Sequence, residues 1–305
     1  MLKPRPLRSG DHVRVVSPAS PTTSESIQGG IQLLESEGYR VSLGDNVFAR
    51  DGYLAGSDDQ RAGDLREAFE DPTVHAVVCA RGGYGCARMM PHLDLDQMAA
   101  SKKTFVGFSD VTTIHLALNR RGLVTFHAPM LLSFSVDRSD WTYASFKSLL
   151  KGLNPIVAGT PRAETLHGGT AEGILTGGCL CLLTDSLATE DSLDCAGKIV
   201  LIEDVDEHPH RVDAMLTHLL NTGQIQKATG IVVGEMSGTD EQSDPKIGAW
   251  PWRRIVEDRL APLNVPTVVN FPIGHMKDML SLPLGVRVRL DADAGTLALL
   301  EDPCE

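Results

Sequence analysis

Short apolar segments alternate with longer amphipathic segments along the first half of the chain, and these two patterns predict strands and helices in turn. The apolar segments are residues 12–17, 39–43, 76–80, 104–107 and 123–127. The amphipathic segments are residues 27–38, 58–70, 86–90 and 111–121. Strands that alternate with helices predict a parallel, doubly wound α/β sheet, whose sites lie at the carboxyl ends of the strands.

The pattern changes after residue 151. Residues 152–169 are rich in Gly, Pro and Thr without a clear period, which predicts a linker. Beyond it, strands are predicted at 173–176, 198–203, 230–234 and 267–270, and helices near 180–187, 210–220 and 250–260. Residues 286–290 and 296–300 alternate as a two-stranded antiparallel ribbon would. We therefore expect a first domain over residues 1–151 and a smaller, β-rich second domain over residues 170–305.

Ser109 follows the strand predicted at residues 104–107 and stands just before a predicted helix. A serine in this context can be a nucleophile held above the sheet edge, beside the backbone N–H groups of a helix start. The match to the G-x-S-x-G elbow is partial, because Gly107 fills the first glycine position and Val111 replaces the second. A serine after a strand can equally cap a helix.

Other strand ends carry groups that could act with a serine. Glu203 is the first carboxylate after the apolar run 199–202, although it could instead cap a helix or pair with Arg211. His275 follows a turn and could instead be an ordinary surface histidine. The glycine cluster at 81–85 could direct backbone N–H groups at an anion, but it lacks the lysine of a Walker motif.

Acyl transfer by a serine needs an imidazole that accepts the hydroxyl proton, a carboxylate that fixes the imidazole, and N–H donors for the oxyanion. Ser109, His275 and Glu203 supply one candidate for each side chain, and all three follow predicted strands. Their order along the chain, serine, acid and histidine, is also the order in α/β-hydrolases. The sequence therefore offers the parts of a serine hydrolase, but spacing alone does not bring them together.

Composition narrows the classes of partner. The chain has 305 residues, of which 42% are hydrophobic and 22% charged, which suits two globular domains. A net charge of −12, without basic residues interleaved with aromatics, argues against nucleic acid as a partner. The first residues do not lead into an apolar signal core, and no apolar run is long enough to span a membrane. We therefore expect a cytoplasmic protein with no membrane partner.

No metal or other cofactor is expected from the sequence. The cysteines lack C-x-x-C spacing and are predicted to be buried, reduced thiols. They are Cys79, Cys86, Cys179, Cys181, Cys195 and Cys304. His208 and His210 flank Pro209, and a turn that enters a helix explains this pair better than a metal site does, because no third ligand stands at a useful spacing.

Five motifs, in order, resemble those of the serine LD-carboxypeptidases, the muramoyltetrapeptide carboxypeptidases of bacterial murein recycling. They are Arg81-Gly82-Gly83-Tyr84-Gly85, Gly107-Phe108-Ser109-Asp110, Gly177-Gly178, residues 202–212 and Gly274-His275. The resemblance covers nearly the whole chain, from Val15 to Gly285. It implies a flavodoxin-like N-terminal domain, a smaller β-rich C-terminal domain, and an active site in the cleft between them.

The resemblance also implies roles for single residues. Ser109 would be the nucleophile, His275 the general base and later acid, and Glu203 the residue that orients His275. The backbone N–H groups of Gly83 and Asp110 would form the oxyanion hole. Further substrate contacts would come from Arg81, Tyr84, Gly178 and Arg211, of which either arginine could instead form an ordinary ion pair. The implied reaction releases the terminal D-alanine of a murein tetrapeptide without a metal, and the implied assembly is a homodimer.

Two alternatives stay open. Where family members often have Trp-Gly-Gly-Asn, this chain has Thr176-Gly177-Gly178-Cys179, which bears on the substrate more than on the reaction. The first alternative is the related group of microcin-immunity carboxypeptidases, which share the fold and triad and cleave an aminoacyl-nucleotide amide. Trp250 or Trp252 could supply an aromatic platform for the base of the nucleotide, or could simply pack against the following helix. The second alternative is a non-catalytic protein that holds an anion in the glycine cluster.

Overall fold

Six strands form the sheet of the first unit, in the order β11-β5-β4-β3-β1-β2. Five of them are parallel to one another: β1 (His12–Val16), β2 (Arg40–Leu43), β3 (Val74–Cys79), β4 (Thr104–Gly107) and β5 (Thr125–His127). The sixth, β11 (Leu282–Leu284), is antiparallel to β5. The order 2-1-3-4-5 of the parallel strands is that of flavodoxin. The predicted doubly wound, flavodoxin-like sheet is therefore confirmed.

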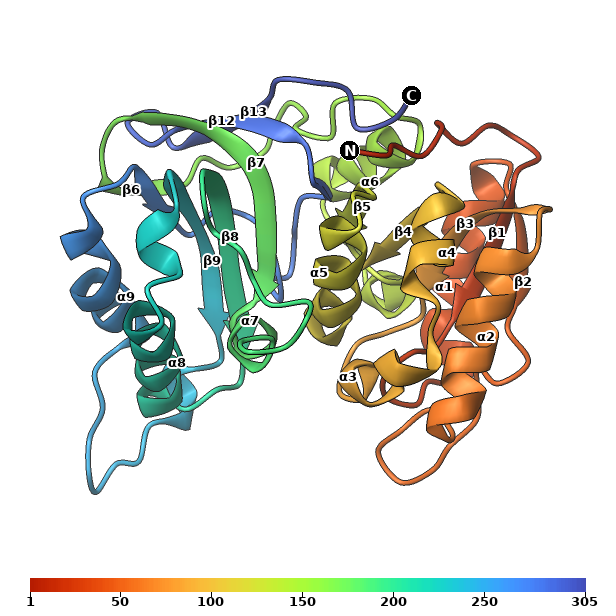
Figure 1. Cartoon of the computed structure of the whole chain (residues 1–305), viewed down its shortest axis with the longest axis horizontal. Helices are drawn as coiled ribbons and strands as arrows, with labels where there is room; N and C mark the ends of the chain where they lie inside the picture. The colour runs from red at the N-terminus through yellow and green to blue at the C-terminus, as the bar shows by residue number, and fades with distance from the viewer. The chain divides into compact units, whose positions relative to one another are not determined.

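Helices cover both faces of this sheet (Figure 1). On one face, α4 (Leu95–Ala100) contacts both α2 (Asp58–Glu70) and α5 (Thr112–Arg120), with the short α3 (Cys86–Met89) beside α2. On the other face, α1 (Ser24–Ser36) packs on the 3₁₀ turn η3 (Leu131–Ser135), which precedes α6 (Asp140–Leu150). Right-handed crossovers place helices on alternate faces wherever the direction of strand addition reverses. That reversal lies between β1 and β3.

The bounds of α2 show how local sequence sets an element. Ser57 accepts a hydrogen bond from Gln60 N, and the Gln60 side chain accepts one from Ser57 N, which together form a capping box. Leu65 and Phe69 lie one turn apart on the buried side of the helix. The helix runs over residues 58–70, as the apolar spacing and the following Asp71-Pro72 predict.

Seven strands form the sheet of the second unit, in the order β13-β12-β7-β8-β9-β10-β6. The four central strands are parallel: β7 (Thr170–Cys179), β8 (Lys198–Val205), β9 (Gly230–Ser237) and β10 (Thr267–Val269). The predicted ribbon is present as β12 (Arg287–Asp291) and β13 (Thr296–Leu299), which are antiparallel. The edge strand β6 (Glu164–His167) falls in the stretch without a period, because none of its residues is buried.

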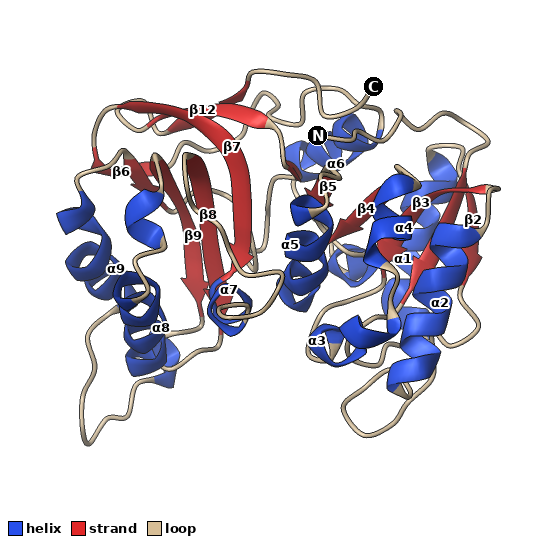
Figure 2. Ribbon diagram, viewed as in Figure 1, coloured by secondary structure: helices blue, strands red, loops and turns tan.

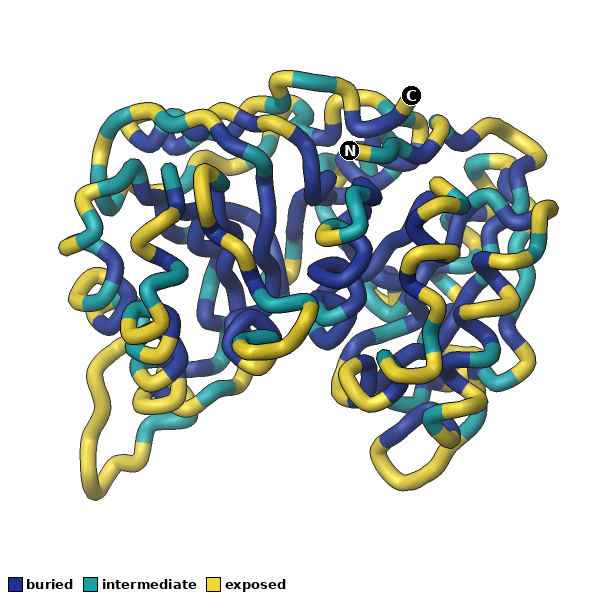
Figure 3. Tube along the Cα trace, in the orientation of Figure 1, coloured by how far each residue is buried: buried dark blue, intermediate teal, exposed yellow.

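Three helices follow the parallel strands of the second unit and contact one another in chain order: α7 (Leu180–Asp185), α8 (Pro209–Asn221) and α9 (Trp252–Leu260). Figure 2 shows these helices against the strands that they connect. The central strand β8 is buried from Ile199 to Asp204, and the strands of both sheets form the dark core in Figure 3. A run of apolar residues buried on both faces is typical of a parallel strand.

The computed structural model describes residues 1–305, and its two units are not continuous in sequence. The first unit comprises Met1–Val157, Leu280–Gly285 and Asp302–Glu305, and the second comprises Ala158–Met279 and Val286–Glu301. None of the helices combines the length and the apolar character that crossing a membrane requires.

Candidate active site

Ser109 stands on a strained turn between β4 and α5 in the first unit. Phe108 is extended, whereas Ser109 has a φ of +65°, and a single 3₁₀ turn, η2 (Ser109–Val111), then leads into α5. A positive φ is uncommon for a residue other than glycine and costs about 1–3 kcal/mol, so it persists where the surroundings enforce it. A positive φ at a serine between a strand and a helix is also the backbone geometry of a nucleophile elbow, in which the serine is presented at the end of a strand.

Two glycines make room for this turn. A Cβ atom at Gly107 would lie 2.8 Å from Val111 Cγ1, so the fully buried Val111 packs directly on the glycine backbone. A Cβ atom at Gly82 would lie 2.8 Å from Ser109 Cβ and 3.0 Å from Ser109 Oγ. The glycine loop after β3 therefore lies directly against the Ser109 side chain. The second glycine position of the elbow motif is filled by Val111, which the glycine at position 107 accommodates.

The glycine loop is fixed at both of its ends. Ser20, in the loop after β1, donates its N–H to Gly82 O at 3.3 Å and accepts the Tyr84 N–H at 3.2 Å. At the other end, Asp110 Oδ2 accepts the Cys86 N–H at 2.8 Å. Gly83 lies between these ties with a φ of +119° and is exposed, so that its backbone is fixed but reachable.

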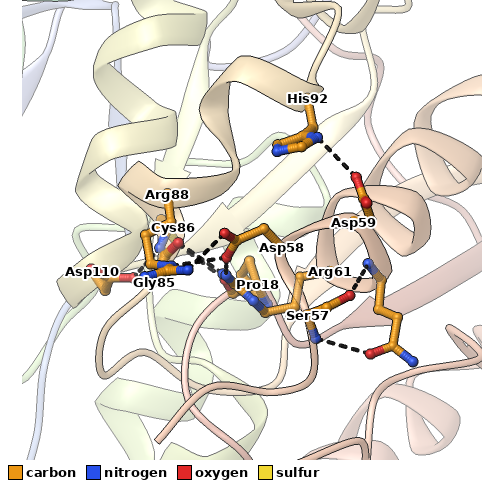
Figure 4. A network of polar contacts seen from close by, with 11 residues as sticks. Pro18, Ser57, Asp58, Asp59, Arg61, Gly85, Cys86, Arg88, His92 and Asp110 are labelled. Atoms are coloured by element: carbon orange, nitrogen blue, oxygen red, sulfur yellow. Dashed lines mark hydrogen bonds and ion pairs between the residues drawn. The ribbon is translucent and has the colours of Figure 1, made fainter. Parts of the chain in front are cut away.

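Arg61 joins the loops that follow β1 and β3 (Figure 4). Its guanidinium is 1% exposed and donates from Nη1 to Pro18 O at 2.6 Å and to Gly85 O at 2.8 Å. It also pairs with Asp58, which accepts two hydrogen bonds from Arg88 on the exposed side. One buried side chain thus holds both loops at the point where the strand order reverses. The sequence analysis missed Arg61, although it stands one helical turn before Leu65 on the buried side of α2.

A second buried network binds the end of β4, just before Ser109. His115 of α5 is fully buried, with Nε2 2.9 Å from Gly107 O and Nδ1 2.8 Å from Thr125 Oγ1. Burial lowers the pKa of His115 to about 3, so the ring is neutral. Because Gly107 O can only accept, Nε2 carries the proton and Nδ1 accepts from the Thr125 hydroxyl. Asn119 Nδ2 in turn donates to Thr125 Oγ1 at 3.0 Å. The sequence analysis missed this network too.

His275 and Glu203 meet in the second unit. Glu203 lies near the end of β8 with a side chain that is 0% exposed, and its Oε2 is 2.7 Å from Nδ1 of His275. Gly274 permits this approach, because it has a φ of +82° and a Cβ atom there would overlap the Glu203 carboxylate. The predicted partnership of the two side chains is therefore present. Arg211, the alternative partner, instead has its Nε 3.9 Å from Oε2 of the nearby Glu207.

The charge around His275 sets its protonation. Burial lowers the pKa of the imidazole, but the charge and the hydrogen bond of Glu203 raise it, and Asp204 and Asp206 add to this, so the pKa lies above its ordinary value. In the neutral ring, Nδ1–H donates to Glu203 and Nε2 keeps its lone pair. A buried carboxylate that fixes one ring nitrogen and leaves the other basic is the arrangement of a general base.

The model of the LD-carboxypeptidase N-terminal domain matches residues 13–128, and that of the LD-carboxypeptidase C-terminal domain matches residues 172–290. The chain belongs to the LD-carboxypeptidase family. The recognised motifs fall within these two matches. The family also agrees with the peptidase activity expected from the sequence, and it assigns the flavodoxin-like unit and the seven-stranded unit to its N- and C-terminal domains.

Relatives of this chain match it over nearly their full lengths. A Streptomyces coelicolor protein with a provisional carboxypeptidase name is 38% identical over 98% of this chain and 96% of its own. The murein tetrapeptide carboxypeptidase of Pseudomonas aeruginosa is 32% identical over 92% of this chain and 93% of its own. These identities extend the family assignment to both units.

Solved structures agree on the fold. The muramoyltetrapeptide carboxypeptidase of Oxalobacter formigenes is 30% identical, with a TM-score of 0.82 over 94% of this chain and 97% of its own. The microcin C7 self-immunity protein MccF in complex with aspartyl sulfamoyl adenosine is 24% identical, with a TM-score of 0.88 over 100% of both chains. At that identity, the likeness to MccF concerns the fold alone.

The residues expected to touch substrate are spread over both units of the chain. Arg81 is half-buried and donates to Gly82 O at 3.2 Å and to Pro21 O at 3.1 Å, so its guanidinium holds loop carbonyls. Tyr84 is 50% exposed and contacts the ring of Tyr53 edge-on. Gly178, with a φ of +147°, is the penultimate residue of β7 and stands opposite Ile202 of β8.

The sequence also singled out two histidines, the cysteines and Trp250. The rings of His208 and His210 stack 5.5 Å apart, and His208 Nδ1 lies 2.8 Å from Gln242 O, at the turn that begins α8. None of the cysteines forms a disulfide, and all except the half-buried Cys181 are buried. The indole of Trp250 is covered by Arg254, whose guanidinium lies 4.3 Å from the ring centroid.

Proposed function

We propose that this chain is a serine LD-carboxypeptidase that releases the terminal D-alanine of murein tetrapeptides. The observation that carries the proposal is the 2.7 Å bond between His275 Nδ1 and the buried Glu203 Oε2, within a chain of the LD-carboxypeptidase family. It prepares an imidazole for proton transfer and leaves Nε2 as the acceptor. The strained turn at Ser109 is the matching feature in the first unit.

The proposed reaction has two steps. Ser109 Oγ attacks the carbonyl carbon that precedes D-alanine, while His275 Nε2 accepts the hydroxyl proton. The C–N bond then breaks as His275 returns this proton to the nitrogen of the departing D-alanine. Water, deprotonated by the same imidazole, attacks the ester carbon and releases the tripeptide and the Ser109 hydroxyl. Glu203 stays ionised and stabilises the imidazolium that forms in each step.

Backbone N–H groups stabilise the negative charge that develops on the carbonyl oxygen. We assign this role to Asp110, the residue after the nucleophile, and to Gly83 of the glycine loop. The placement of Asp110 N at the start of a 3₁₀ turn supports this assignment, as does the exposed backbone of Gly83. The Asp110 side chain has a separate task, because its Oδ2 holds the end of the glycine loop through Cys86 N.

The substrate class comes from the relatives, which include a murein tetrapeptide carboxypeptidase and a muramoyltetrapeptide carboxypeptidase. We extend this substrate class to the present chain and propose that it cleaves the bond between the L-centre of the third residue and D-alanine. In this proposal the protein acts as a homodimer in the cytoplasm, as a step of murein recycling. Arg81 or Arg211 is the proposed partner of the terminal carboxylate, since a planar guanidinium can bind a carboxylate through two hydrogen bonds.

Mass spectrometry of a murein tetrapeptide incubated with the purified protein tests the proposal. The wild type is expected to yield tripeptide and free D-alanine, and Ser109→Ala to lose about 10⁴-fold or more in kcat with its fold intact. Ser148→Ala, a half-buried serine of α6, is the matched control and should keep wild-type turnover. Substantial turnover by Ser109→Ala rejects the serine mechanism.

Two further measurements separate the alternatives. Cleavage of an aminoacyl sulfamoyl adenosine in place of the tetrapeptide would replace the murein substrate with that of the microcin-immunity enzymes, while the serine mechanism would stand. An active-site fluorophosphonate should label the wild type stoichiometrically and Ser109→Ala not at all. Absence of labelling together with absence of turnover on both substrates would favour a non-catalytic binding protein.

A further inference from the structure

Two thiols and a carboxylate converge where β7 and β8 end in the second unit. Cys179 Sγ lies 3.4 Å from Cys181 Sγ and 3.4 Å from Asp204 Oδ1. The three ligand atoms all lie within 4.8 Å of one another. Cys179 and Asp204 are buried, while Cys181 is half-buried at the start of α7. The cluster is therefore compact and can be reached from one side.

These separations are close to the edges of a tetrahedral metal site. With Zn–S bonds of about 2.3 Å and a Zn–O bond of about 2.0 Å, a tetrahedron has S–S edges of about 3.8 Å and S–O edges of about 3.5 Å. The observed S–S separation of 3.4 Å is shorter than this edge by roughly 0.4 Å, and the Cys179 S–O separation of 3.4 Å is shorter by roughly 0.1 Å. The remaining separation, between Cys181 and Asp204, is at most 4.8 Å. Small side-chain rotations would open the cluster to the size of the cation.

We propose that Cys179 Sγ, Cys181 Sγ and Asp204 Oδ1 form a binding site for a thiophilic divalent cation of the Zn²⁺ class, with a water molecule as the fourth ligand. Two thiolates and a carboxylate favour Zn²⁺, Co²⁺ or Cd²⁺ over Mg²⁺ and Ca²⁺, which prefer oxygen ligands alone. This proposal is independent of the proposed hydrolysis, because it concerns none of the groups that act on the peptide.

The backbone already holds the carboxylate in place. Asp204 Oδ2 accepts the Cys181 N–H at 2.9 Å, and Oδ1 accepts the Val205 N–H at 2.8 Å. Such hydrogen bonds orient a ligating carboxylate and are a regular part of metal sites. Because Cys181 N is bound to Asp204, the residue that carries one thiol is tied to the residue that carries the oxygen.

The electrostatics also favour a cation. The pKa of Asp204 is raised to about 6, first by burial and then by the charge of Glu203. The pKa of Cys179 is raised by its hydrogen bond with Cys181, by burial and by both carboxylates. A bound divalent cation favours the anionic form of each ligand. Its two positive charges replace the two protons that the thiols lose, so the total charge of the cluster is unchanged when Asp204 is already ionised.

The C-x-C spacing explains why the sequence did not reveal this cluster. Searches for zinc sites look for C-x-x-C pairs, whereas the third ligand here comes from the neighbouring parallel strand, 23 residues beyond Cys181. The register between the strands makes the connection, because Cys179 of β7 stands opposite Glu203 of β8 and Asp204 follows. The buried Cys79 and Cys86 of the first unit belong to no comparable group.

Titration of the reduced protein with Co²⁺, a spectroscopic probe for zinc sites, tests the proposal. The wild type is expected to bind one Co²⁺ per chain with a thiolate-to-metal charge-transfer band and the visible spectrum of a tetrahedral site. Loading of the metal-free protein with Zn²⁺ should release about two protons per cation near neutral pH, and Zn²⁺ should also displace bound Co²⁺. Cys181→Ser and Asp204→Asn should each weaken binding by at least about tenfold, and Cys195→Ala, a buried thiol outside the cluster, should leave it unchanged.

Every outcome decides the proposal without a peptide substrate. A charge-transfer band that disappears in Cys181→Ser supports the site. Its absence from the wild type under reducing conditions, or equal binding by the wild type and a Cys179→Ser/Cys181→Ser double variant, overturns it. Circular dichroism of each variant shows whether the fold is kept, and Cys181→Ser is the most informative variant because its side chain is half-buried.

Discussion

Nδ1 of His275 lies 2.7 Å from Oε2 of Glu203, a carboxylate without exposed surface at the end of a buried strand. The strand β8 fixes the carboxylate, and the turn at Gly274 brings the imidazole to it. The ring is therefore held by a rigid element of the sheet. A preorganised base of this kind does not lose conformational freedom when the reaction begins.

The roles proposed for this pair make the proposed reaction depend on pH in a defined direction. The imidazole of His275 must be neutral to accept a proton. Burial lowers its pKa, but Glu203 outweighs this effect, so the pKa lies above the ordinary histidine value of 6.5. We therefore expect kcat/KM to fall as the pH decreases from a point above 6.5. Glu203→Gln removes the charge, so the acid limb should move to lower pH while kcat decreases. A pH profile of kcat/KM measures both effects. Glu172→Gln, on the exposed start of β7, should leave the limb in place; an unmoved limb in Glu203→Gln would contradict the assigned role.

Gly82→Ala tests the close approach of the glycine loop to the nucleophile. The added Cβ would lie 2.8 Å from Ser109 Cβ and 3.0 Å from Oγ, so the serine must shift by several tenths of an ångström. We expect kcat to fall about 10²-fold, because small displacements of a nucleophile are costly. Gly63→Ala is the control, since its Cβ would meet nothing within 4 Å on α2 and should stabilise the helix slightly. Equal turnover by the two variants would show that the loop does not confine Ser109.

Arg61→Met and Arg88→Met compare two arginines that share Asp58. Arg61 is buried and also holds two loop carbonyls, so its loss should lower the free energy of unfolding by about 2–4 kcal/mol. Arg88 pairs with Asp58 at the surface, where such a pair contributes about 0–1 kcal/mol. Urea denaturation of both variants measures the difference. Similar losses in the two variants would mean that the loops after β1 and β3 do not depend on the buried guanidinium.

Thr125→Val removes the hydroxyl that fixes the ring of His115 while keeping the shape of the side chain. A buried ring nitrogen and a part-buried amide N–H would each lose a partner, so we expect the free energy of unfolding to fall by about 1–3 kcal/mol. Chemical denaturation provides the measurement, and kcat should fall as well if the elbow is loosened. An unchanged stability would show that the network contributes only packing.

Local patterns predicted the elements and some of the site. The caps and the apolar spacing of α2 depend only on residues of that helix and its immediate neighbours, so they could be predicted from the sequence. The same is true of the strand ends that precede Ser109 and contain Glu203. Arg61, His115 and the Cys179 cluster were missed because their roles come from partners on other strands and loops. Strand β11 was missed for the same reason, since its three residues form a strand only through pairing with β5.

The position of β11 has a consequence for how the protein is made. Residues 282–284 complete the edge of a sheet whose other strands end at His127, and residues 302–305 belong to the same unit. During synthesis, the first unit therefore waits for its last strand until the whole of Ala158–Met279 has left the ribosome. Neither unit can be obtained by a single cut of the gene, and a fragment that stops at Val157 would expose the hydrogen-bonding edge of β5.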